Sequence, residues 1–566
     1  MTNYTAAWSA AIATEPFASW RITTARTLWH NPDRLPEYMV SQGLPWTAEN
    51  MATLWGYAIP GGDSFPAEQF DLHSPATMYA EAYGGEGGAA NGGGARAGNL
   101  RGVQLKGIGA NMFVGATTDK RHGYGAFYLE HAIVDAIYSQ LVSRLLPLGS
   151  VTIYGIIDSG LTIHFHDPEK NYYHSGAGGI LLREECLRLG HFLPAQEFVP
   201  RQHQRQVMTN PQRMRQVMQK LMDSGRGDSA IEHLLLNFLG SSAKQLAWAR
   251  ASRLKHGALT PSNIGVDGRW LDLSQTSMLP LGVNQRITPQ RLPFLQESFA
   301  PPDFALEVLH FYNKYTQRRA TLGGAIRHYD LSWQRAYQEA LLAQSGMQFT
   351  HTTAAAAAAV WVEALSQEIN SNPLPFTDAV DEKQQDDGFT ELLLRAWAGL
   401  DKPTPDAQQQ ALGALIEADW QQAQARGGWL NRQQHQRCCL LRAWRRSAFS
   451  PLFWRSRVYL AVNDICQPET GDVAGLMNEL TAVMDFAYGA ESVEGEVALL
   501  KLNDVQISWR PVTDSYRLVH QQQIIEFAHA SELAHALSAL SLNWTRWRFD
   551  FRRPLLRLLE ALGSIQ

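Results

Sequence analysis

The dipeptide Asp267-Gly268 constrains the local fold more sharply than any other feature of this sequence. It stands between two short apolar runs in the stretch KHGALTPSNIGVDGRWLDLS, residues 255–274. Asp-Gly in such a setting is a strong signal for a β-hairpin with a two-residue turn. A turn centred on this dipeptide pairs Asn263 with Asp272, so we expect an amide oxygen and a carboxylate to face each other at the open end of the hairpin.

An amide oxygen beside a carboxylate suits Mg²⁺, which usually completes its shell with water and phosphate oxygens. Asn263 and Asp272 are therefore candidate metal ligands. The alternative is a polar hairpin base in which Asn263 caps the turn. For an isolated hairpin that alternative is favoured, so the metal hypothesis depends on what the rest of the chain supplies.

Length and composition bound the class of protein. A chain of 566 residues is too long for one hydrophobic core, so roughly two to four structural units are expected. The composition, 45% hydrophobic and 18% charged, is that of an ordinary globular protein. The formal net charge of −5 and the lack of a long basic run give no general attraction for nucleic acid.

The four cysteines, Cys186, Cys438, Cys439 and Cys466, are too few for a disulfide scaffold and are expected to be free thiols in a reducing compartment. His435 close to Cys438 and Cys439 suggests a metal site, but no second ligand group with suitable spacing follows. The N-terminal residues lack the basic start and apolar core of a signal peptide. No apolar run reaches the ~18 residues of a membrane span, so we expect a cytoplasmic protein.

Local patterns divide the chain into five predicted segments of an α+β protein. The strand-rich segment contains a glycine-rich run, and the last segment has four short strand patterns and two helical ones. The expected segments are a helical or irregular one at 1–77, a strand-rich one at 78–200, one with helices and the hairpin at 201–350, a helical extension at 351–490 and a small α+β unit at 491–566.

Several features follow one another in the order typical of a kinase-like ATP site. The glycine-rich run, residues 84–98, precedes a strand pattern with Lys106, and a helix predicted at 126–146 supplies acids. Each feature has a plain alternative: a linker, a solvated lysine and a surface acid. The ordered set favours a nucleotide site in which Lys106 holds phosphate oxygens, a helix acid orients the lysine, and Asn263 with Asp272 holds the metal.

Short motifs along the chain resemble those of the selenoprotein O family of kinase-like protein adenylyltransferases. Their order is also that of the family, and the resemblance extends from about residue 78 to about residue 485. The motifs are GGARA (93–97), QLKGIG (104–109), GYGAFYLEHAIVDAI (123–137), REECLRLGHF (183–192), HGALTPSN (256–263), LDLS (271–274) and SPLFWRSRVYLAVNDI (450–465).

The resemblance implies a two-lobed, protein-kinase-like core with large helical additions and a site for ATP and Mg²⁺. It implies catalytic roles for Lys106 and Asp135, and it places Ser262 where the family has its general base. It also implies metal ligation by Asn263 and Asp272. The nucleotide ligands that it implies are Gly93, Gly94, Arg96, Lys106, Arg183 and Arg188.

The chain departs from the family pattern in spacing as well as in residue type. Lys106 and Asp135 stand further apart in sequence than in the family, whereas Arg183 and Arg188 stand closer together. Ser274 replaces the glycine that follows the metal-binding aspartate by two positions. These departures predict a divergent site rather than a typical one.

Ser262, in place of an aspartate, bears on the substrate. A hydroxyl nucleophile needs a base, and serine cannot act as one near neutral pH. A carboxylate is already ionised at pH 7 and attacks the α-phosphate without a base, giving an acyl-adenylate, if metal and arginines neutralise the crowded charge. The alternatives are adenylylation of protein hydroxyl side chains and an inactive nucleotide-binding scaffold.

The size of the chain and its altered core also resemble the larger maturation protein of siderophore microcins. Proteins of that group work with a small acyltransferase-like partner and join a glycosylated catechol siderophore to the C-terminal carboxylate of a peptide. The resemblance implies that this chain activates the carboxylate of a peptide or protein acceptor. Residues 491–566 lie outside the matched motifs, and they are predicted either to dock a partner or to cap the helical segment.

Overall fold

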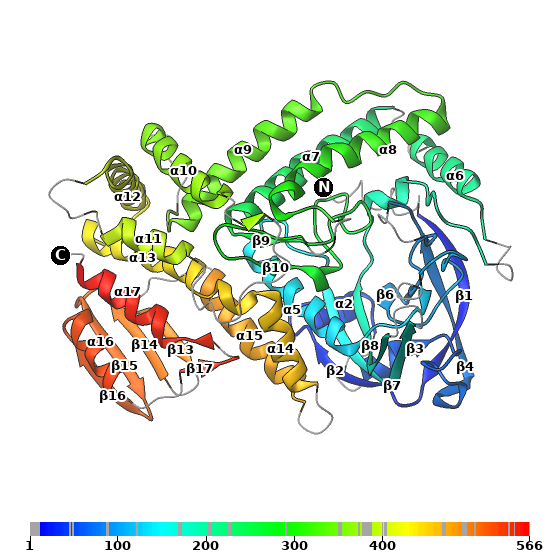
Figure 1. Ribbon diagram of the computed structural model, residues 1–566, viewed down its shortest axis with the longest axis horizontal. Coiled ribbons are helices and arrows are strands. Elements are labelled where there is room, and N and C mark those ends of the chain that lie inside the picture. Colours follow the sequence, from blue (N-terminus) through cyan, green and yellow to red (C-terminus); the bar gives the residue numbers. More distant parts are fainter. Residues whose placement is uncertain are drawn as a thin grey trace.

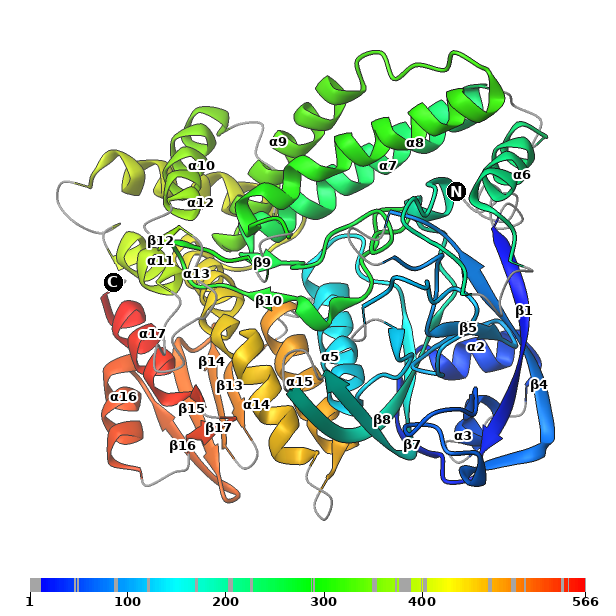
Figure 2. The same cartoon turned by 45° about the vertical axis from the view of Figure 1, so that its right-hand side comes forward.

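The computed structural model describes the chain as a mixed α+β protein, which confirms the predicted class. A large antiparallel sheet lies at one end, a small second sheet lies at the other, and helices lie between and above them (Figures 1 and 2). The described residues are 12–564 except 45–46, 48–49, 86–89, 120–122, 168–171, 202–206, 224–227, 287, 289–290, 349–353, 372–373, 376–387, 399, 401–404, 467–470, 490–494, 503–504, 541–543 and 548.

The large sheet has eight strands in the order β2-β7-β8-β6-β5-β4-β1-β3, and neighbouring strands are antiparallel throughout. The strands predicted near Lys106, after residue 150 and after residue 178 are among them. The bounds are β1 Ala13–Ile22, β2 Arg26–His30, β3 Tyr57–Ala58, β4 Phe70–Ala82, β5 Ala97–Leu100, β6 Val103–Lys106, β7 Ile153–Asp167 and β8 Tyr172–Glu184.

Side chains of β8 alternate between two hydrophobic cores. Leu181 packs in the core that contains α5 (Leu129–Leu145), whereas Ile180 and Leu182 pack in the core that contains the helix α3 (Asn50–Trp55). Successive side chains of a strand point to opposite faces, and here both faces are covered. This is why the strand reads as a continuous apolar run in the sequence rather than as an alternating one.

The prediction of a helical or irregular segment at 1–77 is wrong for much of its described part. β1, β2 and the start of β4 are strands of the large sheet, and the helices are only α2 (Leu35–Ser41) and α3. The expected boundary at 77 also falls inside β4. The β1 segment, ATEPFASWRI, has a weak local strand signal, and its pairing with β4 makes it a strand because tertiary context overrides propensity.

Helices are present where the patterns at 126–146 and after residue 200 predict them, over the described residues. α5 forms where the 126–146 pattern predicts it, and α14 and α15 pack against it between the two sheets (Figure 2). The other helices of this part are α6 Asn210–Asp223, α7 Asp228–Ala251, α8 Ala300–Thr316, α9 Ala325–Gln344, α10 Ala355–Asn370, α11 Phe389–Ala398, α12 Ala407–Ala425, α13 Arg432–Ala448, α14 Arg455–Ile465 and α15 Val473–Tyr488.

The C-terminal α+β unit is confirmed, with an antiparallel sheet in the order β13-β14-β15-β16. The helix α17 packs on α11 and α13, and Trp444 Nε1 of α13 donates to the Pro554 carbonyl at 3.1 Å. The unit therefore caps the helical region through a shared core. Its elements are β13 Val497–Leu502, β14 Val505–Arg510, β15 Ser515–His520, β16 Gln523–Phe527, α16 Ala530–Ala539, β17 Thr545–Arg546, β18 Phe549–Asp550 and α17 Arg552–Ser564.

Two further expectations concern the state of the cysteines and the presence of helices that could cross a membrane. All four cysteines are free thiols, as predicted; three are buried and Cys466 is half-buried. Over the residues that the structure describes, the helices fall short of the length and apolar character needed to cross a membrane.

Candidate functional site

The Asp-Gly turn forms, but the register of its hairpin differs by one residue from the prediction. Gly268 has φ +85°, and its N–H donates to the Gly265 carbonyl at 2.9 Å. The Gly265 N–H in turn donates to the Arg269 carbonyl, and Ile264 pairs with Trp270. A left-handed glycine after the turn lengthens the loop to three residues and shifts the pairing.

Because of this shift, Asn263 does not pair with Asp272, so the predicted pairing is wrong. The Asn263 carbonyl accepts from the Leu271 N–H at 3.3 Å, and the Asn263 amide group donates to the Ala258 carbonyl at 2.8 Å. Asp272 has left-handed backbone angles, φ 60° and ψ 57°. The hairpin by itself therefore does not set the two side chains opposite each other, and Asp272 meets other partners.

Lys106, the last residue of β6, lies between two carboxylates. Its Nζ is 3.2 Å from Asp135 Oδ2 on α5 and pairs directly with Asp272 Oδ1. The Lys106 Nζ also lies 4.4 Å from the centre of the Phe127 ring. Burial lowers the pKa of the ammonium below its usual value, although both carboxylates act in the opposite direction. The structure thus brings the strand lysine and the helix acid together, as their order in the sequence predicts.

Asp272 also meets both predicted arginines. Arg183 Nη1 is 2.7 Å from Asp272 Oδ1, and Arg188 Nη1 is 3.9 Å from Oδ2. Burial alone would raise the pKa of Asp272, but Arg183, Lys106 and Arg188 hold it well below its usual value. The Asp272 side chain is 22% exposed, whereas those of its three cationic partners are at most 6% exposed. We call Lys106, Asp135, Arg183, Arg188 and Asp272 the Asp272 cluster.

Gln104 organises the arginines, and the sequence patterns did not single it out. Its Oε1 accepts from Arg183 Nε at 2.8 Å and from Arg188 Nη2 at 2.9 Å. Gln104 stands two residues before Lys106 on β6, so both side chains lie on one face of the strand. A polar residue two positions from the lysine in a buried strand was the signal that could have found it.

Arg188 is almost fully buried and has a second set of partners. Its guanidinium lies 4.8 Å from the centre of the Tyr83 ring and donates to the Ser262 carbonyl at 3.0 Å. The Arg188 N–H donates to His191 Nδ1, and His191 Nε2 lies 3.3 Å from Glu81 Oε2. Burial would raise the pKa of Glu81, but the His191 hydrogen bond and the Arg188 charge lower it to about 2.

The glycine-rich run packs on β4. The N–H of Gly94 donates to the Glu81 carbonyl at 2.9 Å, and a Cβ at Gly93 would lie 2.1 Å from that carbonyl oxygen. The Gly94 N–H therefore already has an acceptor within the protein, whereas the resemblance implies that it binds the nucleotide. Residues 86–89 of the glycine-rich run lie outside the described part. Arg96 is half-buried, with its guanidinium 5.1 Å from the centre of the Phe127 ring that Lys106 also approaches.

The loop that contains Ser262 is held in place by Glu297, a residue distant from it in sequence. Ser262 Oγ lies 2.9 Å from Thr260 Oγ1, and the loop begins at His256, whose N–H donates to Glu297 Oε2 at 3.0 Å. The Gly257 N–H donates to Glu297 Oε1 at 2.6 Å. Burial raises the pKa of Glu297 to about 7, against the effect of these N–H groups. No sequence spacing pointed to Glu297, because it reaches the loop from a separate 3₁₀ turn, Phe294–Phe299.

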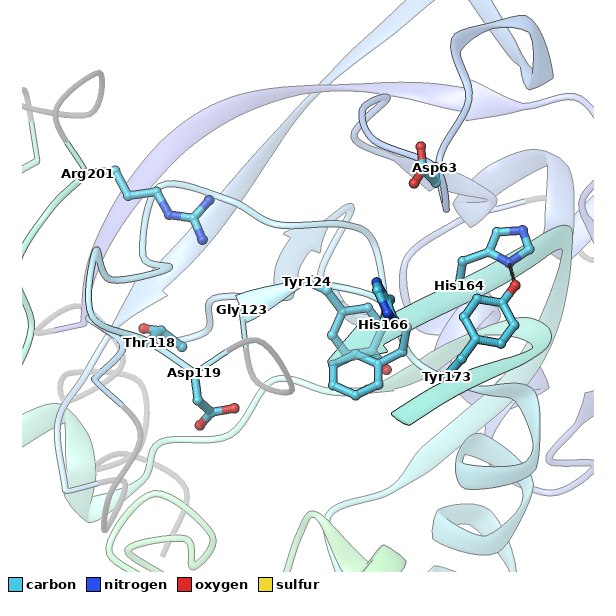
Figure 3. Close-up of a pocket in the computed structure, with 10 residues that line it drawn as sticks. Asp63, Thr118, Asp119, Gly123, Tyr124, His164, His166, Tyr173 and Arg201 are labelled. Carbon is cyan, nitrogen blue, oxygen red and sulfur yellow. Dashed lines mark hydrogen bonds between the residues drawn. The ribbon is translucent and has the colours of Figure 1, made fainter. Parts of the chain in front are cut away.

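A cavity of about 810 Å³ lies beside the β7–β8 ribbon and contains none of the predicted site residues. In Figure 3, Arg201 and Asp119 lie on one side and His164 with Tyr173 on the other; His164 Nδ1 and the Tyr173 hydroxyl are 2.9 Å apart. The lining combines aromatic side chains with acidic, basic and imidazole groups, and it is separate from the Asp272 cluster. The lining residues are Asp63, Thr118, Asp119, Gly123, Tyr124, His164, Phe165, His166, Tyr173 and Arg201.

Comparisons of the sequence with protein-family models and with curated proteins do not indicate a function. No protein-family model and no curated protein matches the chain. The arrangement around Asp272 is therefore the basis for a functional proposal.

Proposed function

We propose that the chain binds ATP with Mg²⁺ at the Asp272 cluster and transfers AMP to a carboxylate of a peptide acceptor. The observation that carries this proposal is the convergence of three buried cations on one partly exposed carboxylate, Asp272. Three cations, Lys106, Arg183 and Arg188, surround two carboxylates, Asp135 and Asp272. Cationic groups that converge in this way suit an anionic ligand, and Asp272 is where the cluster meets solvent.

The cationic side chains suit phosphate oxygens. Guanidinium groups bind phosphate through directed N–H bonds, and Gln104 fixes the orientation of both arginines before any ligand arrives. Over the described residues, Nε of Arg188 is buried and has no hydrogen-bond partner. An anionic oxygen would satisfy this N–H group, so the residues present fit a triphosphate.

Asp272 is the residue best suited to a metal. Its carboxylate is the kind of oxygen ligand that Mg²⁺ requires. Bound MgATP supplies an electrophilic α-phosphate with pyrophosphate as the leaving group. Lys106 and Arg183 already pair with one oxygen of Asp272, so they stabilise its ionised form and hold it ready for the metal.

The order of elements supports the finer proposal of a kinase-like small lobe. The glycine-rich run connects β4 to β5, Lys106 stands on β6, and Asp135 stands on α5. The β7–β8 hairpin follows and pairs with β6. A lysine on the third strand that pairs with an acid of the following helix is the arrangement that positions phosphates in kinases.

The missing base supports a carboxylate as nucleophile. The Ser262 hydroxyl bonds to the Thr260 hydroxyl, and neither group accepts a proton near neutral pH. A carboxylate acceptor needs no proton removed before it attacks, whereas a hydroxyl acceptor does. Among acceptors for this site, a peptide C-terminus therefore fits better than a serine or tyrosine side chain.

We place the acceptor in the cavity of Figure 3. The loop that lines it at Tyr124 continues to Phe127, whose ring lies against Lys106. Tyr124 and Tyr173 offer aromatic faces to an acceptor, which suits an aromatic group such as a catechol conjugate. The variant Tyr173→Ala is expected to raise the KM for the acceptor and to leave the KM for ATP unchanged. A change in both KM values would mean that Tyr173 supports the stability of the fold rather than acceptor binding.

We place a small acyltransferase-like partner at β16. This strand is at the end of its sheet, and Ile524 and Ile525 are 55% and 42% exposed. An exposed edge strand can accept another strand from a partner. Because the unit shares a core with the helices, truncation would unfold both, so the test is Ile525→Lys. Lost partner binding with unchanged AMP transfer is expected, and retained binding would refute docking at this edge.

The experiment that tests the function is pyrophosphate release from ATP with a peptide in two forms. A peptide with a free C-terminal carboxylate should support release, and its C-terminal amide should not. Asp272→Asn should abolish the release, whereas the exposed control Lys314→Ala should keep it. Equal release with acid and amide would contradict carboxylate activation, and calorimetric ATP binding without release would indicate an inactive scaffold.

A further inference from the structure

A second buried polar cluster lies between helices α12 and α13. Asp419 comes from α12, and His435 and Cys439 come from α13. One ligand atom from each residue lies within 4.8 Å of the other two, and the three residues are at most 2% exposed. We propose that Asp419, His435 and Cys439 bind a zinc ion that fastens α12 to α13. We call these three residues the Asp419 cluster.

Local sequence explains how the ligands meet. His435 and Cys439 are four residues apart, so they share one face of α13. Asn431 accepts from the Gln434 N–H at 2.9 Å in a capping box, which fixes where α13 begins. The short connection after α12 returns the chain so that α12 packs on α13 and places Asp419 against that face.

The distances fit a tetrahedral site. His435 Nε2 is 2.9 Å from Asp419 Oδ2, and Cys439 Sγ is 3.9 Å from the same oxygen. Zinc bonds of about 2.0 Å to nitrogen and oxygen and about 2.3 Å to sulfur put neighbouring ligand atoms roughly 3.3–3.6 Å apart. The observed spacings bracket these values, so small rotations of side chains would bring all three to bonding distance.

The charges also balance around a divalent ion. An aspartate and a thiolate together neutralise Zn²⁺, and a neutral imidazole is the third of the four ligands that a tetrahedral site takes. Burial raises the pKa of the Cys439 thiol well above its usual value, and Arg442, whose Nη1 lies 3.6 Å from Cys439 Sγ and 3.1 Å from the Gly346 carbonyl, acts in the opposite direction. Thiolate and imidazole select zinc over Mg²⁺ or Ca²⁺, which require oxygen ligands.

The competing explanation is a buried aspartate–histidine hydrogen bond without metal. Asp419 Oδ1 accepts from the Gln348 N–H at 3.0 Å, which orients the carboxylate in either case. Such an N–H bond behind a ligating carboxylate is the support that metal sites use. In the metal-free explanation the Cys439 thiol donates a long hydrogen bond of 3.9 Å to Asp419 Oδ2, so the metal content of the protein decides between the two explanations.

The first test uses the wild-type full chain, purified under reducing conditions. We expect one zinc ion per chain by elemental analysis. Chelation should lower the thermal unfolding midpoint, and added zinc should restore it, because a ligand that binds only the folded state stabilises it. A midpoint that responds neither to chelator nor to zinc, together with a zinc-free protein, would overturn the proposal.

The second test distinguishes Cys439 of the Asp419 cluster from the adjacent Cys438. Cys438 is an equally buried thiol, adjacent in sequence and outside the Asp419 cluster, so Cys438→Ser is the matched control for Cys439→Ser. Cobalt added to the metal-free wild type and to the control should give a thiolate-to-cobalt absorption band in the near ultraviolet. The band should be missing in Cys439→Ser. The same band in both variants would show adventitious binding elsewhere and would overturn the assignment.

Discussion

The Asp272 cluster and the Asp419 cluster each bury an aspartate, yet their surroundings have opposite character. Asp272 has lysine and arginine partners and keeps 22% of its side chain exposed. Asp419 is fully buried and pairs with an imidazole beside a thiol. The first environment favours an added anion, and the second favours an added cation. A buried acid by itself therefore does not say which ligand a site takes; the charge of its neighbours does.

The two clusters also differ in how the chain assembles them. The Asp272 cluster draws its residues from β6, α5, the end of β8 and the hairpin, and Lys106 meets Asp272 across 166 positions. The Asp419 cluster needs only two consecutive helices. Contacts between residues far apart in sequence form only when the large sheet is complete. Formation of the Asp272 cluster therefore indicates that the whole fold has formed.

The largest expected effect is a difference in stability between two aspartate variants. Asp272→Ala removes the carboxylate that three buried cations share, and breaking buried pairs in this way costs about 3–5 kcal/mol. Asp419→Ala leaves the buried His435 imidazole without its hydrogen-bond partner, which costs about 1–3 kcal/mol. Urea unfolding with chelator present measures both. Equal losses would break the contrast between the two clusters.

Activity should depend on one cluster only. Lys106→Ala removes a cation that contacts Asp272, and we expect AMP transfer to fall roughly 10²–10³-fold, as when a charge-stabilising donor is removed. Asp419→Asn should keep the wild-type rate at temperatures where both proteins are folded. Pyrophosphate release with the peptide acid is the assay. A wild-type rate in Lys106→Ala would remove the Asp272 cluster from the chemistry.

Acid should weaken the Asp272 region through Glu81. The folded pKa of Glu81 is about 2, below the unfolded value of about 4.3. Its stabilising contribution, of the order of 2–3 kcal/mol, is therefore fully present above the unfolded value and is lost as the pH falls towards 2. Glu81→Gln should flatten the fall in unfolding free energy between pH 5 and pH 2. The exposed control Glu363→Gln should follow the wild type, and a wild-type slope in Glu81→Gln would refute this role.

The smallest expected effect tests whether Gln104 prepares the arginines. Gln104→Ala removes one acceptor shared by Arg183 and Arg188, which costs about 1 kcal/mol and roughly a fivefold rise in the KM for ATP. The kcat should stay close to wild type because all charges remain. The exposed glutamine variant Gln367→Ala is the control. A fall in kcat at constant KM would mean that Gln104 acts on the reacting groups.

The sequence by itself determined the α+β class, most helices, the strands of the C-terminal unit and the pairing of Lys106 with the acid of the next helix. These features depend on local periodicity and on the order of elements, which a chain carries in one dimension. The free thiols were predictable from the small number of cysteines in a long chain. The segment before residue 77 was the exception, because β1 is a strand through its pairing with β4 rather than through its own propensity.

Only the tertiary structure decided which polar groups meet. The hairpin register depended on the left-handed conformation of Gly268, which an Asp-Gly dipeptide permits but does not fix. Gln104 was predictable at most from its place on a strand, whereas Glu297 reaches its loop from a distant turn. Asp419 completed a cluster whose other members were visible in the sequence but lacked a partner. Contacts of this kind depend on how elements pack, and sequence spacing does not record packing.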